Sequence, residues 1–141
     1  MKTIIMLILQ LIAVSTVYPQ IMKTMKEVID SKGAISDSDF TEPDNDGFKL
    51  FYISYEKQME TVHSGKYTEI RVFYFTEKKQ DALCVMWKII EPSSEINTNV
   101  KFYNLHMVKK DNLTWKDYET GLIYSIVLKD GFCVTTCTID I

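Results

Sequence analysis

Residues 122–139, LIYSIVLKDGFCVTTCTI, decide the fold class. Two runs rich in β-branched and aromatic residues flank an Asp130-Gly131 pair. An Asp-Gly pair between such runs is a strong short-range signal for a β-hairpin, because both residues of the tight turn must adopt a positive φ. We therefore expect antiparallel strands at residues 122–128 and 132–139, joined by this turn.

The same chemistry recurs upstream, where turn-forming residues separate four more segments of β-branched and aromatic residues. These segments are residues 48–56 (FKLFYISYE), 67–76 (YTEIRVFYFT), 82–91 (ALCVMWKIIE) and 100–108 (VKFYNLHMV). Because the links between them are short, consecutive strands should pair antiparallel as a meander. Residues 36–47 (SDSDFTEPDNDG) are polar, acidic and contain proline and glycine, which predicts a loop.

One short helix is expected ahead of the strands. Residues 21–31 (IMKTMKEVIDS) place Met22, Met25 and Ile29 on one helical face, opposite two lysines and a glutamate. Gly33 follows as a natural helix stop. We expect this N-terminal helix to cover an open face or end of the β-domain.

The beginning of the chain has the features of a secretory signal peptide. Residues 4–14 (IIMLILQLIAV) follow a single lysine and are apolar except for one glutamine. An apolar core of about 7–15 residues suits a signal peptide, whereas a membrane span needs about 20. We expect residues 1–18 to be removed on export, leaving residues 19–141 as one secreted, extracellular β-domain with no membrane association.

Composition and motifs exclude several function classes. Charged residues make up 25% of the chain and aromatic residues 12%, which indicates a globular domain and not a disordered one. The net charge of −3 argues against nucleic-acid binding, which needs a basic face. None of the common catalytic motifs occurs, and no nucleophile is placed beside His63 or His106, so we expect neither an enzyme nor a cofactor.

Export would bring three cysteines into an oxidising compartment that favours pairing. Cys133 and Cys137 are four residues apart in one expected strand. Their Cα atoms would be about 13 Å apart, beyond the roughly 7 Å limit of a disulfide. We expect Cys84 to pair with one of them, leaving the third thiol buried, linked to a second chain, or without a mate that a shortened sequence lacks. No metal site is expected, because the cysteines and histidines lack a ligand spacing.

Asn112-Leu113-Thr114 is the only N-glycosylation sequon in the sequence. In an exported protein Asn112 is a candidate glycan acceptor, which also predicts that its loop faces solvent.

Several large side chains near the middle of the expected strands are suited to enclosing a small molecule. Tyrosine and tryptophan combine apolar area with a hydrogen-bonding tip, as ligand pockets require. The alternative is that each of them is an ordinary core residue of a β-domain. The candidate ligand-binding residues are Tyr52, Tyr74, Trp87, Tyr103 and Tyr124.

Five features occur in a characteristic order: the leader, the helix near Met25, the acidic loop, the stretch FKLFYISYE at residues 48–56, and Leu122-Ile123-Tyr124 ahead of a late cysteine. This order resembles that of arthropod salivary lipocalins of the tick histamine-binding-protein type. The resemblance implies that the meander closes into a lipocalin-like β-barrel, which has eight strands in that family where six are expected here. It also implies a saliva protein that sequesters a small apolar or amphipathic ligand, either a biogenic amine or a lipid mediator, with a host protein as a further partner.

Two other functions remain open. A helix followed by an antiparallel meander is also the order in cystatins, so the chain could be a secreted protein-binding or protease-inhibitor-like domain without a ligand cavity. The cystatin Q-x-V-x-G loop has no counterpart, since residues 58–62 read QMETV. The odd number of cysteines also suits a family member that has lost its function.

Overall fold

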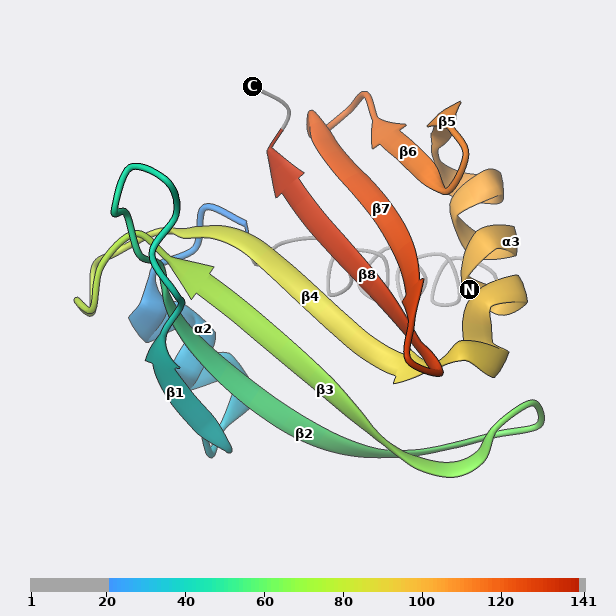
Figure 1. The fold of residues 1–141 in the computed structure, drawn as a ribbon, viewed down its shortest axis with the longest axis horizontal. Coiled ribbons are helices and arrows are strands. Elements are labelled where there is room, and N and C mark those ends of the chain that lie inside the picture. Colours follow the sequence, from blue (N-terminus) through green and yellow to red (C-terminus); the bar gives the residue numbers. More distant parts are fainter. Residues whose placement is uncertain (1–20, 140–141) are drawn as a thin grey trace, which may run out of the picture.

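The computed structural model describes residues 21–139. The signal peptide expected at residues 1–18 lies outside the described residues, as do the two ends of the expected domain 19–141. Within residues 21–139 the chain forms a single large β-sheet with two α-helices (Figure 1). None of the helices in this part of the chain is both long and apolar enough to cross a membrane.

The sheet has eight strands in the order β1-β2-β3-β4-β8-β7-β6-β5, and each strand is antiparallel to its neighbours. The predicted mainly β fold with antiparallel strand pairing is therefore confirmed. Strands β1 and β5 are the two edges, and no ladder joins them among the described residues. The strands are β1 (Asp37–Phe40), β2 (Phe51–Thr61), β3 (Gly65–Phe75), β4 (Cys84–Pro92), β5 (Val108–Asp111), β6 (Thr114–Asp117), β7 (Leu122–Lys129) and β8 (Phe132–Ile139).

Consecutive strands pair as expected at every connection except the one from β4 to β5. There a 3₁₀ turn, η1 (Ser93–Glu95), leads into helix α3 (Ile96–His106). A helix of this length spans about 16 Å, and four strand spacings span about 19 Å. The helix therefore carries the chain past β8, β7 and β6 to the far edge, from which three short connections return it to β4.

The hairpin predicted at Asp130-Gly131 is confirmed. Lys129 pairs with Phe132, so the turn between β7 and β8 contains two residues. Asp130 has a φ of 52° and Gly131 a φ of 80°. Positive φ at both positions is typical of the type I′ turn, whose twist matches that of the strands.

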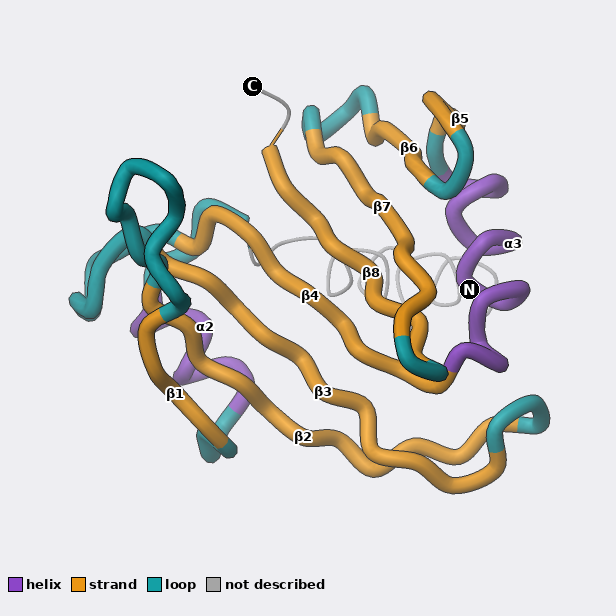
Figure 2. Tube along the Cα trace, in the orientation of Figure 1, coloured by secondary structure: helices purple, strands orange, loops and turns teal. Residues whose placement is uncertain are grey.

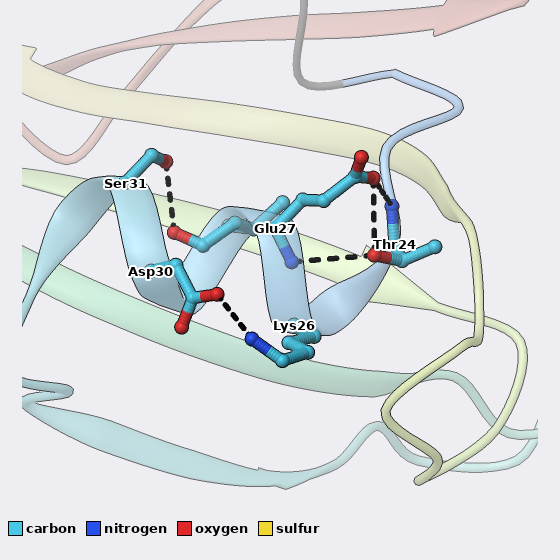
Figure 3. A network of polar contacts seen from close by, with 6 residues as sticks. Thr24, Lys26, Glu27, Asp30 and Ser31 are labelled. Atoms are coloured by element: carbon cyan, nitrogen blue, oxygen red, sulfur yellow. Dashed lines mark hydrogen bonds and ion pairs between the residues drawn. The ribbon is translucent and has the colours of Figure 1, made fainter.

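The predicted N-terminal helix is also confirmed, as α2 (Met25–Lys32). Thr24 and Glu27 form a capping box: the Thr24 hydroxyl accepts from the Glu27 amide, and the Glu27 carboxylate accepts from the Thr24 amide at 2.8 Å (Figure 3). The Lys26–Asp30 pair on the solvent side adds little stability, because both side chains are largely exposed. Gly33 ends the helix at a φ of 85°, which a residue with a Cβ adopts only with strain.

The expectation of a strand at residues 100–108 is wrong, because most of this segment belongs to α3. The apolar side chains of α3 and of the residue that caps its C-terminus follow the helical period: Ile96, Val100, Tyr103 and the cap residue Met107 all contact the hydrophobic core. Packing of this stripe outweighs the β-favouring composition of the segment. The expected loop at residues 36–47 is wrong in part, since it contains β1, a four-residue edge strand whose side chains are all exposed.

The hydrophobic core lies on one face of the sheet, which we call the inner face. Both helices cover this face, at opposite ends of the sheet (Figure 2): Lys32 of α2 lies over the Phe73 ring, and Tyr103 of α3 contacts Trp115. Side chains one position away along each strand point to the opposite, outer face. Six buried residues stand opposite one another across six strands of the inner face: Ile53, Phe73, Trp87, Cys137, Tyr124 and Trp115.

Candidate functional site

A cavity of about 440 Å³ lies between α2, the first two strands and the loop that joins β3 to β4. This volume is within the range of about 300–1,000 Å³ that is typical of small-molecule sites. The wall and floor are apolar and come from α2, the α2–β1 link and β2: Met25, Ile29, Ile35, Phe51 and Ile53.

Backbone hydrogen bonds fix the position of α2 over this cavity. The Met25 amide donates to the Ala82 carbonyl at 2.9 Å, and the Lys26 amide donates to the Gln80 carbonyl at 3.0 Å. These bonds use amides of the first helical turn, which have no partner inside the helix. The first turn of α2 and the β3–β4 loop are therefore held together, and both line the same cavity.

Polar side chains form one rim of the cavity: Ser38 from β1 and Lys78, Lys79, Gln80 and Asp81 from the β3–β4 loop. The Lys78 ammonium lies 5.4 Å from the centre of the Phe51 ring in the cavity floor, in a cation–π contact. Lys79 instead pairs with Glu77 at 3.1 Å. Within residues 21–139, no carboxylate lies within 4.0 Å of the Lys78 ammonium.

Three of the five predicted ligand-binding aromatics lie together on the inner face, away from the cavity lining. The Tyr124 ring is 5.9 Å from Trp87 and 5.3 Å from Tyr103, between ring centres. Tyr103 comes from α3 and is also 5.3 Å from Trp115, which the sequence analysis did not single out. All four side chains are buried. They pack against one another as a core cluster that joins α3 to the sheet.

The other two predicted ligand-binding residues, Tyr52 and Tyr74, lie on the outer face. They are directly opposite in the β2–β3 ladder, one position away from the inner-face pair of Ile53 and Phe73. The Tyr52 hydroxyl donates to Asp37 at 3.1 Å, and the Lys88 ammonium lies 5.6 Å from the Tyr74 ring centre. The five candidates therefore do not form one site.

A second polar cluster lies at the opposite end of β2 and joins the β2–β3 turn to η1. The buried Glu95 carboxylate accepts hydrogen bonds from the Thr61 hydroxyl and, at 2.7 Å, from the Ser64 hydroxyl. The Ser64 and Ser94 hydroxyls are 2.6 Å apart. Burial acts to raise the pKa of Glu95, but these hydrogen bonds and the nearby His63 outweigh it and hold the pKa below its usual value. We call this cluster the Glu95 latch.

Further charges on the inner face already have partners within the protein. The buried Glu69 carboxylate pairs with Arg71 on the same strand. Glu91 accepts a hydrogen bond from the Asn99 side chain at 3.4 Å. Burial, with Glu69 as a second cause, raises the pKa of Glu91. No group of three or more His, Cys, Asp or Glu residues able to hold a metal ion occurs among residues 21–139.

All three cysteines are buried free thiols, which differs from the expected pairing of Cys84 with Cys133 or Cys137. The ladder positions explain the difference. Across the β4–β8 ladder, Cys137 stands opposite Trp87 and Cys133 stands opposite Glu91, so neither cysteine of β8 is directly opposite Cys84. Cys133 and Cys137 lie on β8, as the sequence predicted, and are not bonded to each other.

The thiols should resist alkylation in the native protein. Burial raises the pKa of Cys84 and of Cys137 to about 12 and also raises that of Cys133. A rise from 9 to 12 lowers the thiolate fraction at pH 8 about a thousandfold. We expect no labelling of unreduced protein by iodoacetamide at pH 8 in mass spectrometry, and three labels in denaturant. One label in denaturant would instead show that two cysteines are joined.

Asn112 is exposed in the two-residue turn between β5 and β6, where Asp111 pairs with Thr114. Its glycosylation stays a prediction.

Comparison of the chain with protein-family models, with curated proteins and with solved structures found no match.

Proposed function

We propose that this chain is a secreted, non-enzymatic binding protein that sequesters a small apolar or amphipathic molecule in the cavity beneath α2. The observation that carries the proposal is the cavity itself: about 440 Å³, with an apolar floor and wall and polar side chains along one rim. An occupant with an apolar body and a polar end would fit both regions.

The aromatic cluster around Tyr124 has a structural role in this proposal. Its rings fill the inner face near α3 and contact one another, so they stabilise the sheet on which the cavity is built. The ligand contacts are assigned to the apolar side chains that line the cavity, above all Ile29, Phe51 and Ile53.

A lipocalin-like barrel and export in saliva belong to the same proposal. Eight antiparallel strands with the core on one face support a barrel-like arrangement. The Glu95 latch joins the β2–β3 turn to the segment between β4 and α3, which holds the long β2–β3 hairpin at that end of the sheet. The apolar segment at residues 4–14 supports export, and export would expose the ligand site to host molecules.

The first test is native mass spectrometry of the secreted full chain, in which a co-purified ligand appears as extra mass that denaturation releases. The Ile35→Trp variant places a larger side chain at the cavity wall, from a loop position that is already partly exposed. We expect this variant to bind ten-carbon amphiphiles at least tenfold more weakly, because its indole would occupy the ligand's space.

Val62→Trp is the matched control, because Val62 is fully exposed in the β2–β3 turn, remote from the cavity. It should bind like the unmodified protein in calorimetric titrations. If the unmodified protein carries no extra mass and binds no amphiphile, the proposal is wrong.

A further inference from the structure

We propose that the cavity prefers an occupant with an anionic head group, either a carboxylate or a phosphate, and that Lys78 is the residue that sets this preference. This inference rests on the proposed function, because it assigns the head group of the ligand bound in that cavity. It favours an acidic lipid over a cationic amine.

The position of the Lys78 ammonium carries the inference. Lys78 is on the rim, and its ammonium lies 5.4 Å from the ring centre of Phe51, which is a floor residue. Its charge is thus held over the cavity by the cavity's own floor. With no described carboxylate within 4.0 Å, this ammonium can form an ion pair with an incoming anion without breaking an existing one.

The other two charged residues of the rim, Lys79 and Asp81, do little to oppose an anionic head group. The Lys79 ammonium is paired with Glu77 at 3.1 Å, so these two charges offset each other. Asp81 is exposed and forms no ion pair with any described residue. Only the Lys78 ammonium, among the charged groups of the rim in residues 21–139, lies over the ring of the floor residue Phe51. A cationic head group that entered over Phe51 would therefore meet the ammonium first.

Four probes with the same ten-carbon chain test the head group: decanoate, decyl phosphate, decanol and decylamine, each titrated calorimetrically into the full-length protein. We expect decanoate and decyl phosphate to bind about tenfold more tightly than decylamine, with decanol in between. The two acidic probes also separate a carboxylate preference from a phosphate preference. Binding by all four with equal affinity would refute the anionic preference and leave the proposed function standing, whereas binding by none would refute both.

Variants assign the preference to one residue. Lys78→Met keeps most of the length of the side chain and removes its charge, and it should weaken decanoate binding about fivefold, the size of one partly exposed ion pair. Decanol binding should stay within twofold. Lys109→Met, on the far-edge strand β5, is the control with the same change in net charge and should leave both unchanged.

Asp81→Asn provides the opposite test. Removing this carboxylate should leave decanoate binding unchanged or make it tighter. If Asp81→Asn weakens decylamine binding by more than Lys78→Met weakens decanoate binding, Asp81 sets the head group and the assignment to Lys78 is wrong.

Discussion

Trp115→Ala should lower the free energy of unfolding by about 3–5 kcal/mol, the usual cost of removing a buried aromatic side chain. Trp115 is fully buried on β6. Its ring packs against Tyr103, and its indole N–H donates to the Asn104 side chain of α3 at 2.8 Å. One side chain thus holds α3 both by ring packing and by a hydrogen bond. Urea unfolding followed by far-ultraviolet circular dichroism measures the loss.

Two further variants separate these contributions and remain informative if Trp115→Ala does not fold. Asn104→Ala leaves the ring in place and removes its hydrogen-bond acceptor, which should cost about 1–2 kcal/mol. Leu105→Ala, at a position of α3 that is 72% exposed, should change stability by less than about 0.5 kcal/mol. A similar loss for Leu105→Ala and Trp115→Ala would contradict the role given to Trp115.

Glu95→Ala should cost about 2 kcal/mol and release the end of the β2–β3 hairpin. Glu95 is 3% exposed and accepts hydrogen bonds from Thr61 and Ser64. Each hydrogen bond to a charged group contributes about 1.5–3 kcal/mol, and rehydration of the exposed turn recovers part of this. Hydrogen exchange should speed up at amides on both sides of the turn, with much less change in the β7–β8 hairpin.

The lowered pKa of Glu95 predicts that the stability lost in Glu95→Ala depends on pH. The folded-state pKa of Glu95 lies below its usual value, so the carboxylate contributes stability above the unfolded-state pKa and loses it as the pH falls through the folded-state pKa. The difference in unfolding free energy between Glu95→Ala and the unmodified protein should therefore have its full size at pH 7 and become smaller below about pH 4. Glu60→Ala removes the same charge from an exposed position on β2 and should show neither effect. Equal destabilisation by both variants would show that charge alone, and not the latch, is responsible.

The strands that the sequence predicted correctly are those whose local signals agree. The β7–β8 hairpin has apolar runs, a two-residue turn and an Asp-Gly pair, and the structure places it as predicted. Helix α2 has an apolar face and a glycine stop, and it was also predicted. Strands β1, β5 and β6 have four residues each. Such short segments carry too little periodicity to be found from the sequence. Strands β1 and β6 each pair with a longer strand, and β5 pairs with β6.

The sequence of α3 contains a helical spacing of apolar residues that the strand prediction overlooked. Ile96, Val100, Tyr103 and Met107 are spaced by four, three and four residues, which is the period of a helix. The β-branched and aromatic residues between them favoured a strand instead. The mistake also moved Tyr103 onto a strand, and it left the crossing from β4 to the far edge of the sheet unpredicted.

The candidate site was less predictable than the fold. Residues 51–55 place large side chains on both faces of β2, so alternation alone does not tell which face is inside. The structure buries Phe51, Ile53 and Tyr55 and leaves Tyr52 partly exposed. The cavity also depends on the meeting of α2 with the loop at residues 78–81, two segments far apart in the sequence. No local pattern encodes such a meeting.

The strand order has a consequence for how the chain is made and folded. Strands β1 to β4 are synthesised first and can pair with one another as they emerge, but the second partner of β4 is β8, which follows all the other strands of residues 21–139. Until translation reaches β8, the open edge of β4 exposes unpaired backbone groups, with Trp87 at its centre, and such edges recruit strands from other molecules. The joining of the two halves is a long-range step and should be the slow phase of refolding. Productive folding of this protein would therefore depend on the speed with which the eight-residue strand β8 docks against β4.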